Sequence, residues 1–104
     1  MTKIVDAYPS QSITLGGKSI ATSRASVGAE AELLVAANAS RGKVIIRNTH
    51  ASQVLYIGED ADVATSTGFR VLAEGGVVEL ETTAAIYAIA SGAATTVEVL
   101  ETIV

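Results

Sequence analysis

Residues 95–103 read Thr-Thr-Val-Glu-Val-Leu-Glu-Thr-Ile, and residues 77–81 read Val-Val-Glu-Leu-Glu. In both stretches aliphatic residues alternate with polar ones, as where Glu98 stands between Val97 and Val99. Successive side chains of a β-strand point to opposite faces, so a period of two predicts a strand with one buried and one solvated face. These two stretches therefore indicate a protein built from β-strands.

Short apolar segments recur before and between these two stretches. They are separated by Gly, Asn, Asp and Ser, the residues that favour tight turns. Short strands at regular spacing with such turns are typical of a sandwich or a barrel. We therefore predict an all-β fold, a compact antiparallel β-sandwich or jelly-roll-like barrel of about seven to nine short strands. The further strands are expected at residues 32–36, 43–47, 53–57, 69–72 and 85–90.

Residues 29–37, Ala-Glu-Ala-Glu-Leu-Leu-Val-Ala-Ala, consist of good helix formers. The stretch is short, however, it follows Gly28, and Glu32 and Leu34 alternate with Leu33 and neighbouring apolar residues. We therefore predict a strand here, because tertiary packing overrides weak local propensity.

Glycines stand at the boundaries between the predicted strands. Each is expected at a turn position that requires a positive φ, which glycine adopts without steric cost. They are Gly58, Gly68, Gly75, Gly76 and Gly92.

Two segments offer apolar side chains to both faces: Lys-Val-Ile-Ile-Arg at 43–47 and Val-Leu-Tyr-Ile at 54–57. Such a strand is either central and covered on both sides, or it meets another subunit on its outer face. In a two-layer sandwich of this length a second internal cover is hard to supply, which favours a partner.

The first 28 residues differ from the rest, with many Ser and Thr, the one proline and only short apolar pieces. We predict two parts, an extended N-terminal arm with one or two short strands at 1–28 and a β-sandwich domain at 29–104. The alternative for the arm is an ordinary hairpin around Gly16 and Gly17. As the arm's partner-binding anchors we expect its apolar residues, Ile4, Val5, Tyr8, Ile13 and Leu15.

The composition excludes several classes of function. A chain of 104 residues holds one core, and the absence of cysteine excludes disulfides, thiolate nucleophiles and cysteine-bound zinc. The net charge is −4 and the arginines are dispersed, which argues against nucleic acid as a partner. Neither a signal peptide nor an apolar run long enough to span a membrane is present. With 17% charged residues, the surface suits either a subunit covered by neighbours or a robust exposed β-protein.

Candidate catalytic groups are few. His50 is the single histidine and stands in an expected turn. The sequence indicates no carboxylate or activated nucleophile that would act with it in catalysis, and no further ligands that would bind a metal with it. The carboxylates of Glu59, Asp60 and Asp62 form a dense cluster that lacks the calcium-loop pattern, and a solvated loop is preferred to a weak cation site. Gly17-Lys18-Ser19 resembles the end of a phosphate-binding loop without its opening glycine. We therefore expect no enzyme, no metal, no cofactor and no small-molecule substrate.

Several segments together resemble a recurring module of tailed-bacteriophage structural proteins. The resemblance covers about two-thirds of the chain, and its motifs are patterns of strands and turns. The matching segments are residues 33–38, 41–49, 54–58, 67–72, 73–76, 78–80, 86–92 and 97–101.

The resemblance implies a small β-sandwich on the phage particle, most often a decoration (cement) protein that stabilises the head by bridging capsid subunits. It implies the major capsid protein as partner, a homotrimer, and a place on the virion surface after synthesis in the host cytoplasm. One alternative is a tail, connector or fibre accessory protein. The other is a virion-displayed carbohydrate- or receptor-binding module, which would need exposed aromatics among Tyr8, Tyr56, Phe69 and Tyr87, although Tyr56 and Phe69 are expected in the core.

Overall fold

The computed structural model describes residues 19–104 as eight strands. Every strand predicted from the sequence is present, including the one at the helix-forming stretch after Gly28. No helix within residues 19–104 is long and apolar enough to cross a membrane. The strands are β1 (Ser19–Val27), β2 (Glu32–Val35), β3 (Arg41–Asn48), β4 (Leu55–Gly58), β5 (Phe69–Val71), β6 (Gly76–Leu80), β7 (Ile86–Ala90) and β8 (Thr95–Ile103).

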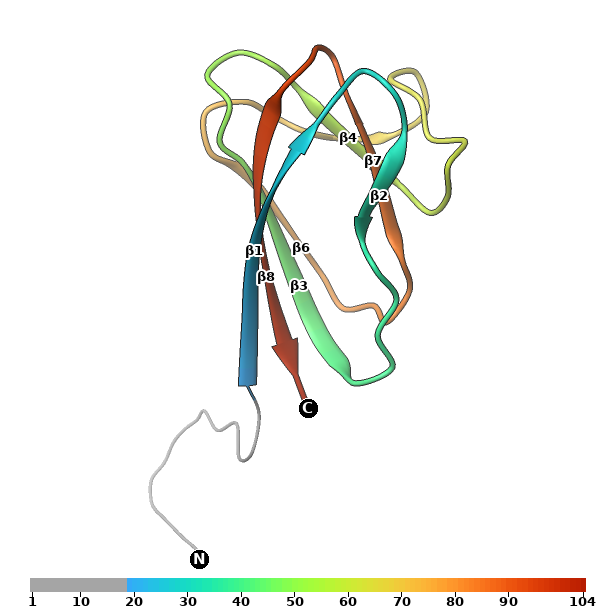
Figure 1. Cartoon of the computed structure of the whole chain (residues 1–104), viewed down its shortest axis with the longest axis vertical. Coiled ribbons are helices and arrows are strands. Elements are labelled where there is room, and N and C mark those ends of the chain that lie inside the picture. The colour runs from blue at the N-terminus through green and yellow to red at the C-terminus, as the bar shows by residue number, and fades with distance from the viewer. Residues whose placement is uncertain (1–18) are drawn as a thin grey trace, which may run out of the picture.

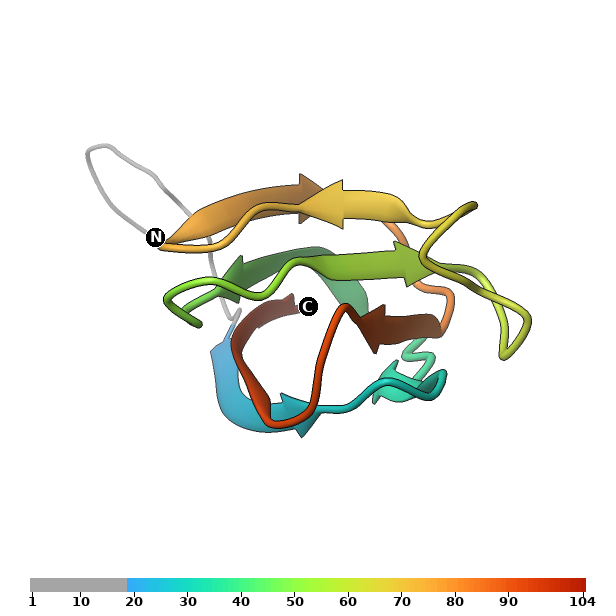
Figure 2. The same ribbon diagram turned by 90° about the horizontal axis from the view of Figure 1, so that it is seen from above.

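The strands form two four-stranded antiparallel sheets, in the orders β1-β8-β3-β6 and β2-β7-β4-β5 (Figure 1). The first strand pairs with the last, the second with the second-last, and so inward to β4 and β5. Apart from the β4–β5 connection, every link crosses from one sheet to the other. This nested pairing in two sheets is the jelly roll, so the predicted fold class is confirmed. Seen from above, β5 and β6 lie along one side of the molecule and β1 and β2 along the other (Figure 2).

The core lies between the inner faces of the two sheets, where alternate residues of each strand point. In β8, Val97 and Val99 are buried while Glu98 lies on the outer face, as the alternation predicted. In the central strands β3 and β4 the residues of the inner face are buried, whereas Ile45 and Tyr56 on the outer faces stay partly exposed, so the structure supplies no second cover for them within residues 19–104. The residues that fill the core are Val27, Val35, Val44, Ile46, Leu55, Ile57, Val71, Ile86, Ala88, Ala90, Val97 and Val99.

Strand β1 corrects the boundary expected between arm and sandwich. Its residues 19–27 were assigned to the arm, yet they pair with β8 along their whole length, from Ser19 opposite Ile103 to Val27 opposite Thr95. The sandwich therefore includes residues 19–27, which were expected in the arm. Gly16, Gly17 and the expected anchors Ile4, Val5, Tyr8, Ile13 and Leu15 lie outside the described residues.

A buried arginine joins both sheets at the end of the sandwich where β3 begins. The Arg41 side chain is fully buried, and it forms a 2.8 Å ion pair with Glu101 on β8. It also donates to the main-chain oxygens of Ala36 at 2.9 Å, Thr82 at 2.8 Å and Ala84. One guanidinium thus connects β8 to the β2–β3 and β6–β7 loops, which are far apart in sequence.

Asn48 has the corresponding role at the other end of β3. It is fully buried, and its Nδ2 donates to the main-chain oxygens of Gln53 at 2.8 Å and Val71 at 3.0 Å. Its Oδ1 accepts the main-chain N–H of His50 at 3.0 Å. Because buried polar groups are stable only when paired, these bonds fix the β3–β4 turn against the end of β5.

The glycines at strand boundaries are mostly required for space rather than for positive φ. Among the described glycines only Gly75 has a positive φ, of 92°, so the expectation was wrong for the other four. A Cβ on Gly58 would lie 2.7 Å from the Val63 side chain, and one on Gly76 would lie 2.2 Å from the Leu72 carbonyl oxygen. Two further residues in the described part of the chain, Glu74 and Ala94, have a positive φ.

Ala94 provides a test of this backbone geometry. Its φ of 58° is in the left-handed region, which costs an L-residue about 1–2 kcal/mol. Ala94→Gly is expected to stabilise the protein by about 0.5 kcal/mol, because relief of this strain exceeds the added entropy of the unfolded chain. The measurement is the midpoint of urea unfolding, with Ala93→Gly as a control expected to destabilise. A shift of the same sign in both variants would contradict the explanation.

Candidate functional site

His50 serves the β3–β4 turn. Its Nδ1 accepts the main-chain N–H groups of Ser52 and Gln53, each at 3.0 Å. The lone pair that a general base would use is therefore engaged within the turn. The geometry gives His50 a structural role.

The acidic loop, residues 59–68 between β4 and β5, is a projecting element with fixed geometry. Val63 is buried against Gly58 and Gly68. Asp60 Oδ1 accepts the Asp62 N–H at 2.9 Å, and the Asp60 carbonyl accepts the Val63 N–H. Within residues 19–104 no group of three or more His, Cys, Asp and Glu side chains is placed to hold a metal ion.

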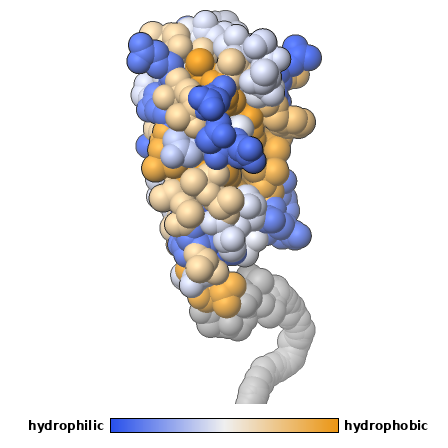
Figure 3. All heavy atoms as spheres, turned by 90° about the vertical axis from the view of Figure 1, so that its right-hand side faces the viewer, coloured by the Kyte–Doolittle hydropathy of each residue, from blue (hydrophilic) through white to orange (hydrophobic). Residues whose placement is uncertain are grey.

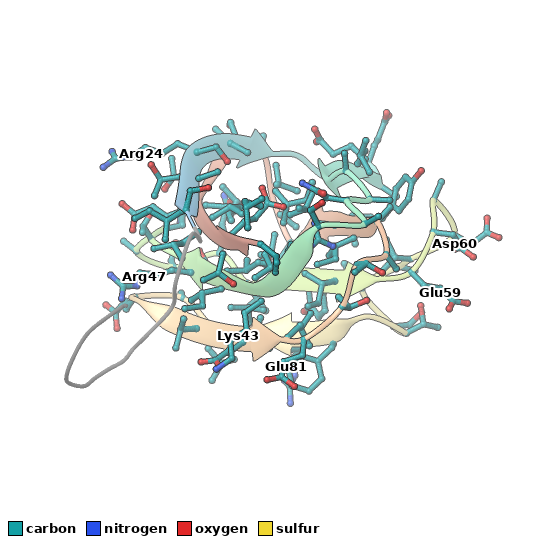
Figure 4. The ribbon with its side chains drawn as sticks, turned by 90° about the horizontal axis from the view of Figure 1, so that it is seen from below. Arg24, Lys43, Arg47, Glu59, Asp60 and Glu81 are labelled. Atoms are coloured by element: carbon teal, nitrogen blue, oxygen red, sulfur yellow. The ribbon has the colours of Figure 1, made fainter. Side chains whose placement is uncertain are left out.

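The carboxylates of this loop point into solvent. Glu59, Asp60 and Asp62 are all exposed, and Figure 4 shows Glu59 and Asp60 directed away from the body. Figure 3, which faces the side of the molecule that carries the loop, shows hydrophilic side chains gathered in the upper half with apolar surface beside them. The loop is therefore a charged projection available for contact.

The outer face of the β1-β8-β3-β6 sheet carries a charged row across three strands. Glu98 on β8 lies between Arg24 on β1 and Arg47 on β3, at 3.2 Å and 3.9 Å. The arginine side chains are 83% and 55% exposed, so these ion pairs add little to stability but fix the positions of the charges.

A second exposed ion pair lies on the same face, between Lys43 on β3 and Glu79 on β6, at 3.0 Å. The hydrogen bond from Lys43 to Glu79, the charge of that carboxylate and the charge of Glu81 raise the pKa of Lys43 above its ordinary value. The attraction is fully present below the ordinary pKa of lysine and is lost as the pH rises through the raised pKa.

The arginine groove lies beside the charged row. Its floor is Ile45 and Leu100, which face each other across β3 and β8 and are half-buried. It is a concavity of about 640 Å³, lined among others by Thr22, Arg24, Arg47 and Glu98. It presents two guanidinium groups above an apolar floor.

A second groove opens along the side formed by β5 and β6. It has a volume of about 470 Å³, and Val78, Leu80 and Ile86 are among its lining residues. Phe69, expected in the core, is 63% exposed at its mouth. It pairs with Ile57 at the end of a three-residue edge strand, and the opposite sheet does not cover it there. Tyr56, also expected in the core, is partly exposed.

The four sheet edges are protected to different degrees. β5 has three residues, β6 has five and β2 has four with a register shift. β1 has nine residues and carries one charge and no proline. Short strands, bulges, charges and prolines protect edges against pairing with another chain, so among the strands of residues 19–104 the edge strand β1 is the least protected.

No protein-family model matches the chain, and no curated protein matches it. A solved chain of Bacillus, described with endospore appendages that "form a novel family of disulfide-linked pili", has a TM-score of 0.52 to this structure. The two chains are 14% identical, and the match covers 83% of each. What they share is the fold. At this identity the likeness indicates a similar β-architecture and does not transfer a role.

Proposed function

We propose that this protein is a non-catalytic structural subunit of a phage particle, a decoration protein that binds the outside of the head and bridges capsid subunits. The observation that carries the proposal is the β1 edge. It is nine residues long and poorly protected, and it begins directly after the segment that contains the five apolar anchors. An open sheet edge next to apolar anchors suits attachment by added strands and apolar contact.

The mechanism is mechanical. A nine-residue strand offers an edge of about 30 Å, along which an extended segment of the capsid protein adds main-chain hydrogen bonds. Ile4, Val5, Tyr8, Ile13 and Leu15 add buried apolar area on a neighbouring subunit. When the protein has bound one capsid subunit, its second contact forms at a raised effective concentration. A protein that holds two capsid subunits at once therefore resists their separation.

Deletion of residues 1–18 tests the attachment. The truncated chain keeps β1 and the eight described strands, so it is expected to fold, and it should lose most of its capsid binding because only the β1 edge remains. The measurement is co-sedimentation with capsids that lack the protein, with circular dichroism to verify folding. Alanine at Ser10, Gln11 and Ser12, polar residues of the same segment, is the control and should leave binding unchanged. Full binding by the folded truncated chain would refute the role of the anchors.

The likeness to an appendage protein favours a second candidate, a subunit of an extracellular filament. The present chain has no cysteine, so disulfides could not link the subunits of such a filament. Electron microscopy of the protein mixed with capsids distinguishes the candidates, because a decoration protein binds the capsid surface and a subunit of an independent filament does not.

The exposed ring of Phe69 favours a carbohydrate-binding module as a third candidate, since sugars stack on exposed aromatic rings. Binding to a glycan array that is lost in Phe69→Ala would support it.

A further inference from the structure

We infer that copies of this chain join head to tail, with the acidic loop of one copy seated in the arginine groove of the next. The inference rests on the proposed structural role and names a second copy of the chain as a partner. It concerns a contact separate from the attachment through residues 1–18.

The two elements lie on opposite sides of the molecule. In Figure 1, β1 runs along the left and the acidic loop projects at the upper right. Figure 4 places Arg24 and Arg47 on one side, and Glu59 and Asp60 on the other. A contact between two different patches on opposite sides is heterologous, so each copy can bind one neighbour on each side.

The shapes of the two elements match. The loop is a projection whose conformation is fixed by Val63 and by the Asp60 hydrogen bonds, and the groove is a concavity of about 640 Å³. A rigid projection loses little conformational entropy when it binds. Ala61, small and exposed between the carboxylates, presents an apolar surface to the Ile45–Leu100 floor.

The charges also match. Arg24 and Arg47 share one carboxylate, that of Glu98, so the row has a net charge of +1, while Glu79 beside Ile45 is paired with Lys43. Glu59, Asp60 and Asp62 bring three carboxylates on exposed side chains. An incoming carboxylate forms a charge-assisted hydrogen bond with a guanidinium above an apolar floor, where water is partly displaced.

The symmetry of the product depends on the rotation between neighbours. A heterologous contact closes into a ring when the rotation divides a full turn, and otherwise continues as a filament. Because the loop and the groove lie on opposite sides of one copy, the contact favours an open filament over a three-membered ring.

Charge exchange between two variants of the full chain tests the contact. The first variant, Arg24→Glu with Arg47→Glu, reverses the charge of the groove. The second, Glu59→Lys with Asp62→Lys, reverses the charge of the loop. It keeps Asp60, whose side chain accepts the hydrogen bond that holds the turn. The control, Glu30→Lys with Glu74→Lys, changes the net charge as the second variant does but at exposed sites outside both elements. Sedimentation velocity across protein concentrations measures self-association, and circular dichroism verifies folding.

We expect the wild type and the control to associate, and each reversed variant to associate about tenfold more weakly or not at all. An equimolar mixture of the two variants should associate again. The acidic groove of the first variant then binds the basic loop of the second, and the unchanged loop of the first binds the unchanged groove of the second. Glu98→Gln should strengthen association by removing the competing carboxylate. A monomeric wild type up to about 1 mM, or folded reversed variants that associate like the wild type, would overturn the inference.

Capsid co-sedimentation of the same variants keeps the two proposals separate. Loss of self-association with retained capsid binding supports the head-to-tail contact and leaves the decoration role intact. Capsid binding that fails in the wild type, while the charge exchange succeeds, refutes the decoration role alone.

Discussion

Replacing Arg41 with alanine is expected to lower the free energy of unfolding by about 3–5 kcal/mol, the usual cost of removing one partner of a buried ion pair. The substitution leaves the Glu101 carboxylate without its cation and the carbonyls of Ala36, Thr82 and Ala84 without their donor. Since domains of this size have a total stability of about 5–15 kcal/mol, this loss is a large fraction of the total and should lower the urea midpoint clearly. Urea unfolding followed by circular dichroism measures the loss.

Arg47→Ala is the matched control, because it removes an arginine from the same strand whose side chain is 55% exposed. It should cost about 0.5 kcal/mol or less. Arg41→Lys should fall between the two, since an ammonium keeps the charge but cannot reach all four acceptors in the guanidinium geometry. If Arg41→Ala cost no more than Arg47→Ala, the buried cation would not be what joins the two sheets.

Replacing Gly76 with alanine is the second substitution with a large expected effect, a loss of about 3 kcal/mol. The added Cβ would stand 2.2 Å from the Leu72 carbonyl oxygen and 2.8 Å from the Leu72 nitrogen, and both are main-chain atoms. A flexible side chain could move aside, but the β5–β6 turn cannot. The turn is held by hydrogen bonds from the Glu74 and Gly75 amides to the carbonyls of His50 and Asn48.

Gly28→Ala is the control for this substitution. A Cβ there meets nothing within 4 Å, and its φ is not positive. Its effect on the urea midpoint should lie within about 0.5 kcal/mol of zero. Equal losses in the two variants would show that the cost arises from the general properties of glycine rather than from contact with Leu72.

Strands with an inner apolar face could be predicted from the sequence because the sheet imposes a period of two. Val97 and Val99 around Glu98 reported the orientation of β8 directly, and the turn residues marked where each strand ends. A strand was also correctly predicted within residues 29–37, although this stretch consists of good helix formers. So short a segment gains more stability from pairing with β7 than from its helix propensity.

Strand β1 could not be predicted, because its residues bury almost nothing. Its inward positions include Ala21, Ser23 and Ala25, and only Val27 is fully buried. The strand is held by main-chain hydrogen bonds to β8, which any side-chain sequence can form. Hydrophobic periodicity does not detect a strand of this kind.

The candidate site was beyond prediction for a related reason. Arg24, Arg47 and Glu98 are distant in sequence, and only the register of β1 and β3 on β8 places them in one row. The burial of Arg41 depends on acceptors from three other segments, none adjacent to it. The cluster of Glu59, Asp60 and Asp62 could be recognised in the sequence. Its position on the side of the molecule opposite the arginines depends on the order of the strands in the sheets.

The nested order of the strands has a consequence for synthesis. The first described strand has the last strand as its only neighbour in the sheet, with Ser19 opposite Ile103. During translation, β4 with β5 can pair early, then β3 with β6 and β2 with β7, but β1 must wait until β8 has been made. Of the eight described strands, the first to be synthesised is therefore the last to gain its neighbour in the sheet, and until then it can pair with other chains.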